Sequence, residues 1–358
     1  MKVRTLGIIG GGQLGRMICF SAHKMGFSTV ILTDQKNSPA SEVSNKTIIS
    51  DYSDKKGLEE FCNLVDFATF EFENIPLKTV EFIGSRTNLY PNSTILKITQ
   101  NRILEKNFLK ENNIKTTEFK EIKNLNTLEE TVKIFKKSIL KTALMGYDGK
   151  GQYVLNNVNE AKQSWIKVKN QSLILEKFCQ FDCEISVIVA RSISNEISVY
   201  EPLLNIHKDG ILRQSHYPAK INKDLKLKAM SIAKKIAIKL NLIGVLAVEF
   251  FVVDNQLMVN ELAPRPHNSG HFSMDACLTS QFDQLIRAIA DYKLGITKFH
   301  SSGYMQNIIG KDIDNISKYY KNAKAKVHLY GKKEAKDGRK MGHINIIPNP
   351  IFKSFKKN

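Results

Sequence analysis

The segment LAVEFFVVDNQLMVNELAPRPHNSGH, residues 246–271, decides the fold of this chain. It places Glu249 and Glu261 on two short apolar runs that flank a turn at Asp254 and Asn255. Two carboxylates on an apolar hairpin are costly to bury unless they are paired or bound to a metal. Hard divalent cations prefer oxygen ligands of this kind. The segment therefore predicts a metal that holds the phosphates of a nucleotide, and hence ATP chemistry.

The register of this hairpin decides whether its two carboxylates can share an ion. A two-residue turn would send Glu249 and Glu261 to opposite faces, whereas a three-residue turn would set them opposite each other. Only the second register makes a shared metal site, and we predict it. The same register gives the cross-strand pairs Phe251–Val259 and Val253–Leu257.

The composition is that of a globular protein. At 358 residues and 42% apolar, the chain can bury a large core, and its size predicts two to three domains. No apolar run reaches the length of about 20 residues that a membrane-spanning helix needs, and the opening lacks a signal-like core. We therefore expect a cytoplasmic protein without a membrane partner. The five cysteines are odd in number and form no CxxC pair, which argues against a disulfide framework and against a zinc site.

A formal net charge of +18 raises the possibility of nucleic-acid binding. The lysines, however, are scattered through helical stretches such as residues 223–239, which is typical of a solvated basic surface. We therefore expect no nucleic-acid partner. One local cluster near the C-terminus suits either a small phosphorylated ligand or a solvated turn: Lys332, Lys333, Lys336, Arg339 and Lys340.

The order of apolar runs predicts two kinds of architecture, α/β and then α+β. The first hundred residues alternate short apolar runs with helical patterns, which favours a parallel sheet flanked by helices. Strands are expected at residues 6–9, 30–32, 47–49 and 67–72. From residue 139 onward strands and hairpins dominate, with helices expected at about 225–240 and 275–292.

A glycine-rich turn follows the first expected strand. Gly10, Gly12 and Gly15 form GxGxxG, and Asp34 ends the next strand, as in a dinucleotide-binding fold. Taken alone, this motif indicates an NAD(P)-dependent oxidoreductase. The glycines, however, only let the backbone approach a phosphate at a helix N-terminus, so a phosphosugar would fit equally well. The motif therefore leaves the ligand open.

A second glycine-rich stretch, GYDGKGQ at residues 146–152, follows a strand that ends near Lys141. Its backbone amides can reach phosphate oxygens, and Lys141 and Lys150 add positive charge. A hairpin turn is the alternative for such a stretch. The lysine and the distant carboxylate pair favour the phosphate-binding interpretation.

Several other carboxylates lie where strands end. Glu71 and Glu73 fall at the end of a parallel strand, where a ribose hydroxyl or solvent would suit them equally well. Glu176 and Glu184 lie on or beside strands and can also accept ribose hydroxyls. His207, in a turn before KDG, is more often structural than a ligand.

Five strings together closely resemble the N5-carboxyaminoimidazole ribonucleotide synthetase family, ATP-grasp enzymes of purine biosynthesis. They are GGGQLGRM at 10–17, FEFEN at 70–74, GYDGKGQ at 146–152, NELAPR with HNSGH at 260–271, and GRKMGH at 338–343. The resemblance runs from residue 1 to about 347. It implies a Rossmann-like pre-ATP-grasp domain over 1–100, an ATP-grasp domain over 101–295 and a small C-terminal domain over 296–358, assembled as a homodimer.

The resemblance also implies an ATP-dependent ligase that uses Mg2+. ATP would phosphorylate bicarbonate to carboxyphosphate, and the carboxyl unit would pass to the 5-amino group of 5-aminoimidazole ribonucleotide. The nearest alternative is the formate-dependent glycinamide ribonucleotide transformylase, which shares the architecture. HNSGH together with GRKMGH favours the carboxylating enzyme, and an oxidoreductase would leave the carboxylate hairpin unexplained.

The same resemblance implies a role for individual residues. Glu249 and Glu261 would bind magnesium, and Asp148 would accept a hydrogen bond from the attacking amine. Bicarbonate and the acyl phosphate would be stabilised by Arg265, His267, Asn268 and His271. The ribonucleotide would be positioned by Gln13, Glu73, Lys333, Arg339 and Lys340, the last three taking its phosphate. ATP would be held by Arg102, Lys141, Gly146, Tyr147, Asp148, Gly149, Lys150, Gly151, Gln152, Glu176, Lys177, Phe178, Cys179, Glu184, His207, Asn260 and Glu261.

Overall fold

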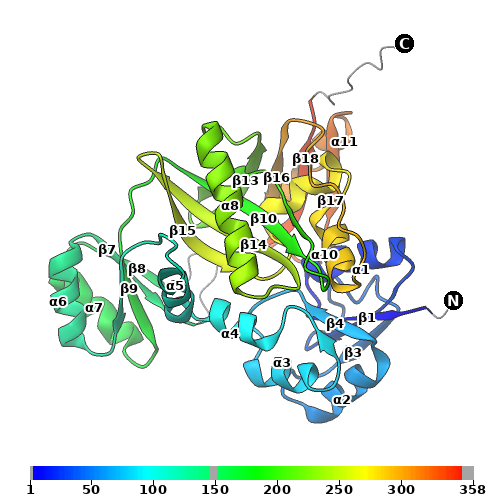
Figure 1. The fold of residues 1–358 in the computed structure, drawn as a ribbon, viewed down its shortest axis with the longest axis horizontal. Helices are drawn as coiled ribbons and strands as arrows, with labels where there is room; N and C mark the ends of the chain where they lie inside the picture. The colour runs from blue at the N-terminus through cyan, green and yellow to red at the C-terminus, as the bar shows by residue number, and fades with distance from the viewer. Residues whose placement is uncertain (1–2, 145–150, 349–358) are drawn as a thin grey trace.

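The computed structural model describes residues 3–144 and 151–348 and contains three sheets (Figure 1). The first is a five-stranded parallel sheet of order β3-β2-β1-β4-β5. Its strands are β1 (Thr5–Ile9), β2 (Ser28–Thr33), β3 (Lys46–Ile49), β4 (Phe67–Phe70) and β5 (Asn88–Leu89). The helices between them are α1 (Gln13–Lys24), α2 (Lys55–Leu64) and α3 (Leu77–Gly84). The predicted parallel α/β unit is confirmed, although its fourth strand ends at Phe70 and not at residue 72.

A smaller, antiparallel sheet of order β6-β9-β7-β8 forms a lobe at one end of the molecule (Figure 1). Two helices, α4 (Ser93–Gln100) and α5 (Arg102–Glu111), lead into it. Its strands are β6 (Phe119–Ile122), β7 (Ser138–Thr142), β8 (Gln152–Leu155) and β9 (Leu173–Lys177). Helices α6 (Leu125–Phe135) and α7 (Val158–Val168) cover it and share its apolar core.

The largest sheet has nine strands, in the order β15-β14-β10-β12-β13-β16-β18-β17, with β11 paired to β10. Its first part consists of β10 (Cys183–Arg191), β11 (Ile197–Val199), β12 (Leu203–Lys208), β13 (Ile211–Tyr217), β14 (Gly244–Val253) and β15 (Gln256–Ala263). The C-terminal segment adds β16 (Gly303–Ile309), β17 (Ala325–Leu329) and β18 (Lys340–Ile346). Short helices η2 (Gly310–Asn315) and α11 (Ser317–Tyr320) lie between β16 and β17. Because β13 pairs with β16, the C-terminal segment continues the sheet of the middle of the chain.

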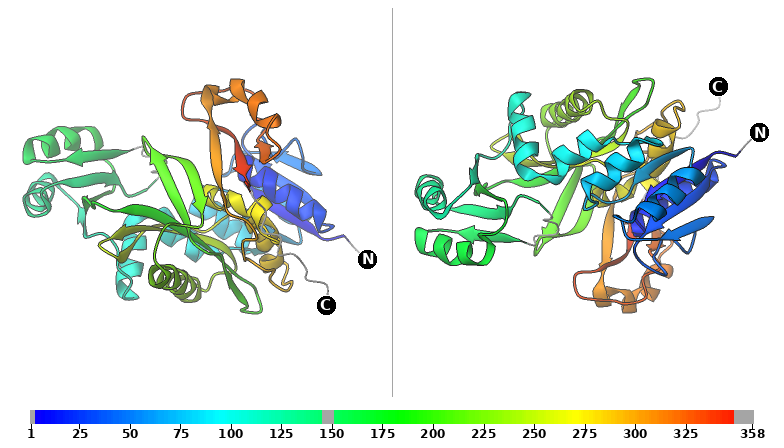
Figure 2. Two further views of the ribbon diagram at one scale, coloured as in Figure 1. Left: turned by 90° about the horizontal axis from the view of Figure 1, so that it is seen from above. Right: turned by 90° about the horizontal axis from the view of Figure 1, so that it is seen from below.

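The large sheet lies between the small lobe and the first sheet, as both views in Figure 2 show. The predicted helix near residues 225–240 is confirmed as α8 (Lys223–Lys239). No helix among the described residues is long and apolar enough to cross a membrane.

The expected single helix over residues 275–292 is wrong. The chain instead forms η1 (Asn268–Phe272), α9 (Ser273–Ala276) and, after a break, α10 (Gln281–Ile289). Ser280 causes the restart, because its Oγ accepts a hydrogen bond from the backbone N of Asp283, 3.0 Å away, at the N-terminus of α10. The break also brings Gln281 against the segment that follows β15.

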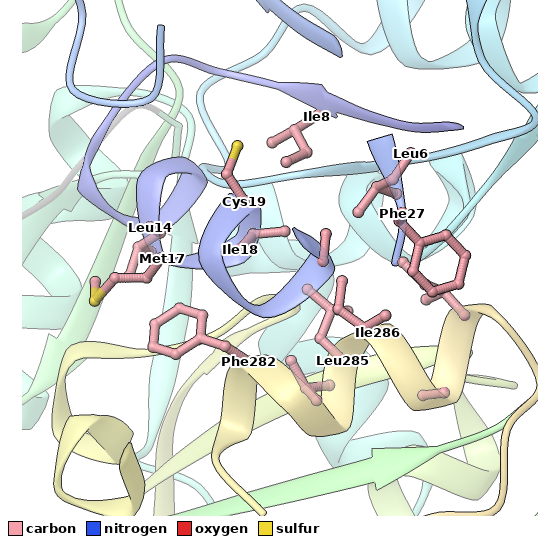
Figure 3. Close-up of a cluster of buried hydrophobic side chains, with 14 of the residues drawn as sticks. Leu6, Ile8, Leu14, Met17, Ile18, Cys19, Phe27, Phe282, Leu285 and Ile286 are labelled. Atoms are coloured by element: carbon pink, nitrogen blue, oxygen red, sulfur yellow. The ribbon is translucent and has the colours of Figure 1, made fainter. Parts of the chain in front are cut away.

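An apolar cluster packs α1 against α10 (Figure 3). Met17 and Ile18 on α1 contribute to it together with Phe282 and Leu285 on α10, and all four side chains are buried. Burial of each such side chain stabilises the fold by about 1.5–3 kcal/mol. This packing fixes the glycine-rich turn that precedes α1 relative to the large sheet.

Candidate active site

A cavity of about 540 Å³ is lined by residues of the small and large sheets, of helices α1, α4 and α5, and of the segment that follows β4 in the first sheet. Of the residues predicted to form the site, it brings together Gln13, Glu73, Arg102, Lys141, Gln152, Glu184, His207, Glu249, Asn260, Glu261, Arg265, His267, Asn268 and Lys340. It does not include Gly151, Glu176, Lys177, Phe178, Cys179, His271, Lys333 or Arg339 among its lining residues. Gly146, Tyr147, Asp148, Gly149 and Lys150 lie outside the described residues.

The hairpin turn differs from the predicted one. Asp254 and Asn255 have φ values of 46° and 58°, and they form a two-residue turn that pairs Val253 with Gln256. Positive φ at both central residues is the type I′ geometry that matches the twist of antiparallel strands. The predicted three-residue turn is therefore wrong. The strand pairs are Phe251–Met258, Phe250–Val259 and Val252–Leu257, instead of Phe251–Val259 and Val253–Leu257.

An irregularity in the ladder nevertheless brings the two carboxylates to one cavity. The register shifts between Val248, which pairs with Leu262, and Phe250. One extra residue on β15 therefore lies opposite β14 here, as in a β-bulge. Glu249 and Glu261 both line the cavity as a result.

The environment of this carboxylate pair favours a bound cation. Burial raises the pKa of Glu249 to about 8, and the charge of Glu261 acts in the same direction. Glu261 is also 3.3 Å from the guanidinium of Arg102. Two hard oxygen ligands of this kind suit magnesium. The described residues contain no group of three or more His, Cys, Asp and Glu side chains placed to share one ion, so nucleotide phosphates would have to complete the coordination.

Glu176 does not face the cavity. Burial alone would raise its pKa, but the charges of Lys106, Lys141 and Arg102 outweigh burial and lower the pKa to about 2. The carboxylate lies 3.1 Å from the ammonium of Lys141 and 3.5 Å from that of Lys106. Its structural role is therefore to hold two lysines, one of which lines the cavity.

Glu184 and His207 form a hydrogen-bonded pair at the cavity wall. Burial lowers the pKa of His207, but the hydrogen bond and the charge of Glu184 outweigh it and raise the pKa. His207, an isolated histidine in the sequence pattern, thus has a defined carboxylate partner, and both side chains face the same space as Glu249.

The segment after β15 brings polar groups to the carboxylate pair. The Nε2 atom of His267 lies 3.5 Å from Oε1 of Glu249, and Nε of Arg265 lies 2.8 Å from Oε2 of Glu73. The side-chain amide of Asn268 is buried at the cavity, and neither its N nor its O has a hydrogen-bond partner. A buried amide without partners costs stability unless a ligand or water satisfies it.

Gln281 holds this segment in place and was missed by the sequence analysis. Its Oε1 accepts a hydrogen bond from the backbone N of His267, and its Nε2 donates to the backbone O of the same residue, both at 2.8 Å. Its Nε2 is also 3.0 Å from Nδ1 of His271. Gln281 is fully buried at the start of α10, and no pattern in the sequence set it apart from other helical residues.

His271 lies behind the cavity wall, and its ring contacts a pair of stacked histidines through His343. Its ring centroid is 4.6 Å from that of His343, which is in turn 4.5 Å from that of His328. The hydroxyl of Tyr330 lies 2.9 Å from Nδ1 of His343. His328 bonds to Asp275, 2.7 Å away, so the stack connects the site to β17 and β18.

We expect His343→Gln to reduce the acid sensitivity of the fold. Burial, with smaller contributions from His271 and His328, holds the pKa of His343 well below its usual range. Below pH 6.5 the unfolded chain takes up a proton that the folded protein does not, so stability is lost as the pH falls. The loss from one such group is about 1.4 kcal/mol between pH 7.5 and 5.5. Melting temperatures at the two pH values should differ less in the variant, and an unchanged difference would contradict the prediction.

The glycine-rich turn before α1 holds a carboxylate of the chain itself. Oε1 of Glu71 accepts a hydrogen bond from the backbone N of Gly12 at 2.6 Å, and Oε2 accepts one from Gly15 at 3.1 Å. These amides at the N-terminus of α1 are the ones that a dinucleotide phosphate would need. The arrangement argues against the NAD(P) alternative and leaves Gln13, the first residue of α1, at the cavity.

The C-terminal basic cluster reaches the cavity through Lys340, the first residue of β18. Arg339 donates from Nη1 to the backbone O of Glu334 at 3.2 Å, and Lys333 is exposed. Lys333 and Arg339 lie on the connection between β17 and β18, and Lys340 lies where this connection ends. Only Lys340 among them faces the cavity.

Two charged residues on α5, Glu105 and Lys106, were also missed. Both are buried, and Glu105 lines the cavity. Burial raises the pKa of Glu105 to about 8, and Glu261 acts in the same direction. A signal was available, because Arg102, Glu105, Lys106 and Leu109 follow the i, i+3, i+4, i+7 spacing of one helix face. Charged residues at such positions are normally read as solvent-facing.

Comparison with known proteins gives matches over nearly the whole chain. Family models match at residues 3–100 (ribonucleotide synthetase preATP-grasp domain), 107–282 (ATP-grasp domain) and 303–351 (phosphoribosylaminoimidazole carboxylase C-terminal domain). The N5-carboxyaminoimidazole ribonucleotide synthase of Brucella melitensis is 41% identical over 347 residues, which cover 96% of each chain.

Solved structures agree with these matches. An ADP complex of an N5-carboxyaminoimidazole ribonucleotide synthetase is 41% identical with a TM-score of 0.93, covering 97% of this chain and 93% of the other. The Aspergillus clavatus N5-carboxyaminoimidazole synthase in complex with ADP and 5-aminoimidazole ribonucleotide is 27% identical with a TM-score of 0.91, covering 97% and 94%. The chain therefore belongs to the N5-carboxyaminoimidazole ribonucleotide synthase family of ATP-grasp enzymes.

Proposed function

We propose that this protein carboxylates the 5-amino group of 5-aminoimidazole ribonucleotide, using ATP and bicarbonate, in purine biosynthesis. The observation that carries the proposal is the composition of the cavity. It combines a carboxylate pair for a metal–nucleotide complex, Glu249 and Glu261, with three groups that suit a ribonucleotide: Gln13 of α1, Glu73 after β4 and Lys340 of β18. The family of the chain supports the same reaction, as does the solved structure of a similar synthetase in complex with ADP.

The nucleotide would bind on the side of the small sheet. Arg102 and Lys141 would hold the phosphates, with Glu176 fixing Lys141 from behind. Glu184 and His207 would complete the nucleotide site, and we retain Lys177, Phe178, Cys179, Asn260 and residues 146–152 as ATP-binding residues in this proposal. Positive groups fixed before the reaction stabilise the charge that develops on the transferred phosphoryl group.

Magnesium would be held by Glu249 and Glu261. Their oxygens are ligands that fit this ion, and the raised pKa of Glu249 reflects burial and then repulsion by Glu261, both of which a cation would offset. When bound, the ion neutralises phosphate charge during phosphoryl transfer.

Bicarbonate would bind near Arg265, His267 and Asn268. The unpartnered amide of Asn268 can donate to one oxygen and accept from a hydroxyl, so both of its orphaned atoms would be satisfied. His271 lies behind the wall and would act by fixing His267 through Gln281. Asp148 would accept a hydrogen bond from the attacking amine. Enclosure of the cavity would protect carboxyphosphate from water.

The ribonucleotide would bind between the first sheet and β18. Gln13 and Glu73 would orient its base and ribose, and Lys340 would take its phosphate. Lys333 and Arg339 stay part of the proposed phosphate site because they lie on the connection that leads into Lys340. The same proposal includes the domain division 1–100, 101–295 and 296–358, a homodimer, and a cytoplasmic location.

An assay with each substrate omitted in turn tests this function. ADP formation should require bicarbonate and magnesium, and 5-aminoimidazole ribonucleotide should stimulate it. Formation of the carboxylated ribonucleotide, followed with labelled bicarbonate, should match ADP formation in amount. Stimulation by formate together with glycinamide ribonucleotide would instead transfer the chain to the transformylase reaction.

A further inference from the structure

Lys106 of α5 lies at a junction between two of the sheets. Its side chain is only 1% exposed, and its Nζ donates hydrogen bonds to Oγ1 of Thr116 at 2.8 Å, Oγ1 of Thr117 at 2.9 Å and the backbone O of Asn260 at 3.2 Å. An ammonium group has three donors. All three are used, and Glu176 lies 3.5 Å away as a counter-charge.

The two threonines extend these bonds in opposite directions. The hydroxyl of Thr117 donates to Oε2 of Glu176 on β9, 3.0 Å away, and so reaches the small sheet. The hydroxyl of Thr116 donates to the backbone O of Val259 on β15, 2.8 Å away, and so reaches the large sheet. Each hydroxyl thus accepts a hydrogen bond from Lys106 and donates one to a residue of one of the two sheets. The ammonium is the point at which both connections meet.

Both ends of this network carry groups of the proposed nucleotide site. Asn260 is followed at once by Glu261, which lines the cavity. Glu176 holds the ammonium of Lys141, 3.1 Å away, and Lys141 also lines the cavity. The distance between the carboxylate on the large sheet and the lysine on the small sheet is therefore set through Lys106.

We propose that Lys106 is a positioning residue for nucleotide binding: it holds the Asn260–Glu261 end of β15 and the Glu176–Lys141 pair at the separation that the ATP phosphates require. The proposal rests on the proposed function, because it assumes that these groups bind ATP. A purely structural lysine would only neutralise Glu176. Glu176 already has Lys141 as a partner, and two of the oxygens that Lys106 contacts belong to the threonine link and not to a carboxylate.

The test compares Lys106→Met and Thr117→Val with a matched control, Lys115→Met. Methionine fills a similar volume without charge or donors, and valine removes only the hydroxyl that joins Lys106 to Glu176. Lys115 lies on the connection between α5 and β6, as Thr116 and Thr117 do. It also contacts the β14–β15 hairpin, through Oε1 of Gln256 at 2.7 Å, but its side chain is exposed. Its replacement should leave nucleotide binding unchanged.

The readout is ADP binding by calorimetry with magnesium and without any acceptor substrate, alongside steady-state kinetics. We expect Lys106→Met to weaken ADP binding at least tenfold and to raise KM for ATP, with KM for the ribonucleotide within twofold of the original. Thr117→Val should weaken ADP binding about threefold or more while remaining folded. Unchanged ADP binding in folded Thr117→Val, or in Lys106→Met with only a lower melting temperature, would overturn the proposal. Because ADP binding needs no acceptor, this result stands even if the acceptor of the reaction proves to be another amine.

Discussion

Replacing Glu261 with glutamine is expected to lower the rate of ADP formation at saturating substrates by at least about a hundredfold. Glutamine keeps the shape of the side chain but removes the negative charge that would hold magnesium beside Glu249. A hundredfold loss corresponds to about 2.7 kcal/mol of transition-state stabilisation, which is within the several kcal/mol that a bound metal ion supplies. The loss should persist in excess magnesium, since the geometry of the ion and not only its affinity is changed.

The fold should tolerate this change. Glu261 is on a cavity wall with 39% of its side chain exposed, and its only described ion pair is with Arg102. The melting temperature should therefore stay close to that of the original protein. Glu60→Gln is a matched control, because Glu60 is exposed on α2 and pairs with Lys46. Near-normal turnover of Glu261→Gln would remove this residue from the metal site.

In the β14–β15 hairpin, the sequence predicts the carboxylate pair correctly but not the turn that connects the strands. The presence of two carboxylates on paired strands followed from the apolar pattern, and both do line one cavity. The two carboxylates reach the same cavity in another way than predicted. The turn has two residues, and a register shift near Glu249 brings Glu261 to the same side as Glu249. A bulge adds one residue without leaving a composition signal. Residue counts alone could therefore not separate a longer turn from a bulge.

The parallel sheet was also predictable from the apolar pattern of its strands. Buried parallel strands give short apolar runs, as β1, β2 and β4 do, and the partly exposed β3 keeps an apolar pair of isoleucines. All four begin within two residues of the expected positions. The split of the expected helix into α9 and α10 was not predictable from periodicity, because α10 keeps apolar residues at helical spacing and the four residues of α9 are too few to show a period. Its cause is a side-chain cap at Ser280 and the tertiary contacts of Gln281.

Buried polar residues were the main omission at the site. Lys106 and Gln281 contact cavity-lining residues from behind, whereas Glu105 lines the cavity itself, and each of the three is buried by elements that are distant in the sequence. The identity of such partners depends on tertiary packing. The resemblance to a family implied roles only for residues that would contact ligands. It implied none for the residues that hold those side chains in place.

Gly12→Ala is expected to destabilise the fold by about 3 kcal/mol and to raise KM for the ribonucleotide. An added Cβ at residue 12 would lie 2.5 Å and 2.9 Å from the two carboxylate oxygens of Glu71. The backbone itself is not the obstacle, since Gly12 has a φ of −79°, which alanine adopts freely. The carboxylate would have to move and lose the amides of Gly12 and Gly15. A buried charge that loses its partners costs several kcal/mol.

Gly84→Ala provides the control, because Gly84 belongs to the same N-terminal unit as the last residue of α3, and its added Cβ would meet nothing closer than 4.0 Å. Helix propensity makes that change neutral or stabilising. Urea unfolding and the kinetics of both variants give the comparison. If both variants lose stability equally, the clash with Glu71 is not the cause.

A double variant separates this clash from any other effect at Gly12. Glu71→Ala alone should also destabilise, since it leaves the amides of Gly12 and Gly15 without their acceptor. Combined with Gly12→Ala, it removes the oxygens that the new Cβ would strike. The two losses should therefore be strongly non-additive, with the double variant close to Glu71→Ala alone. Additive losses would mean that contact with Glu71 is not what makes alanine costly at residue 12.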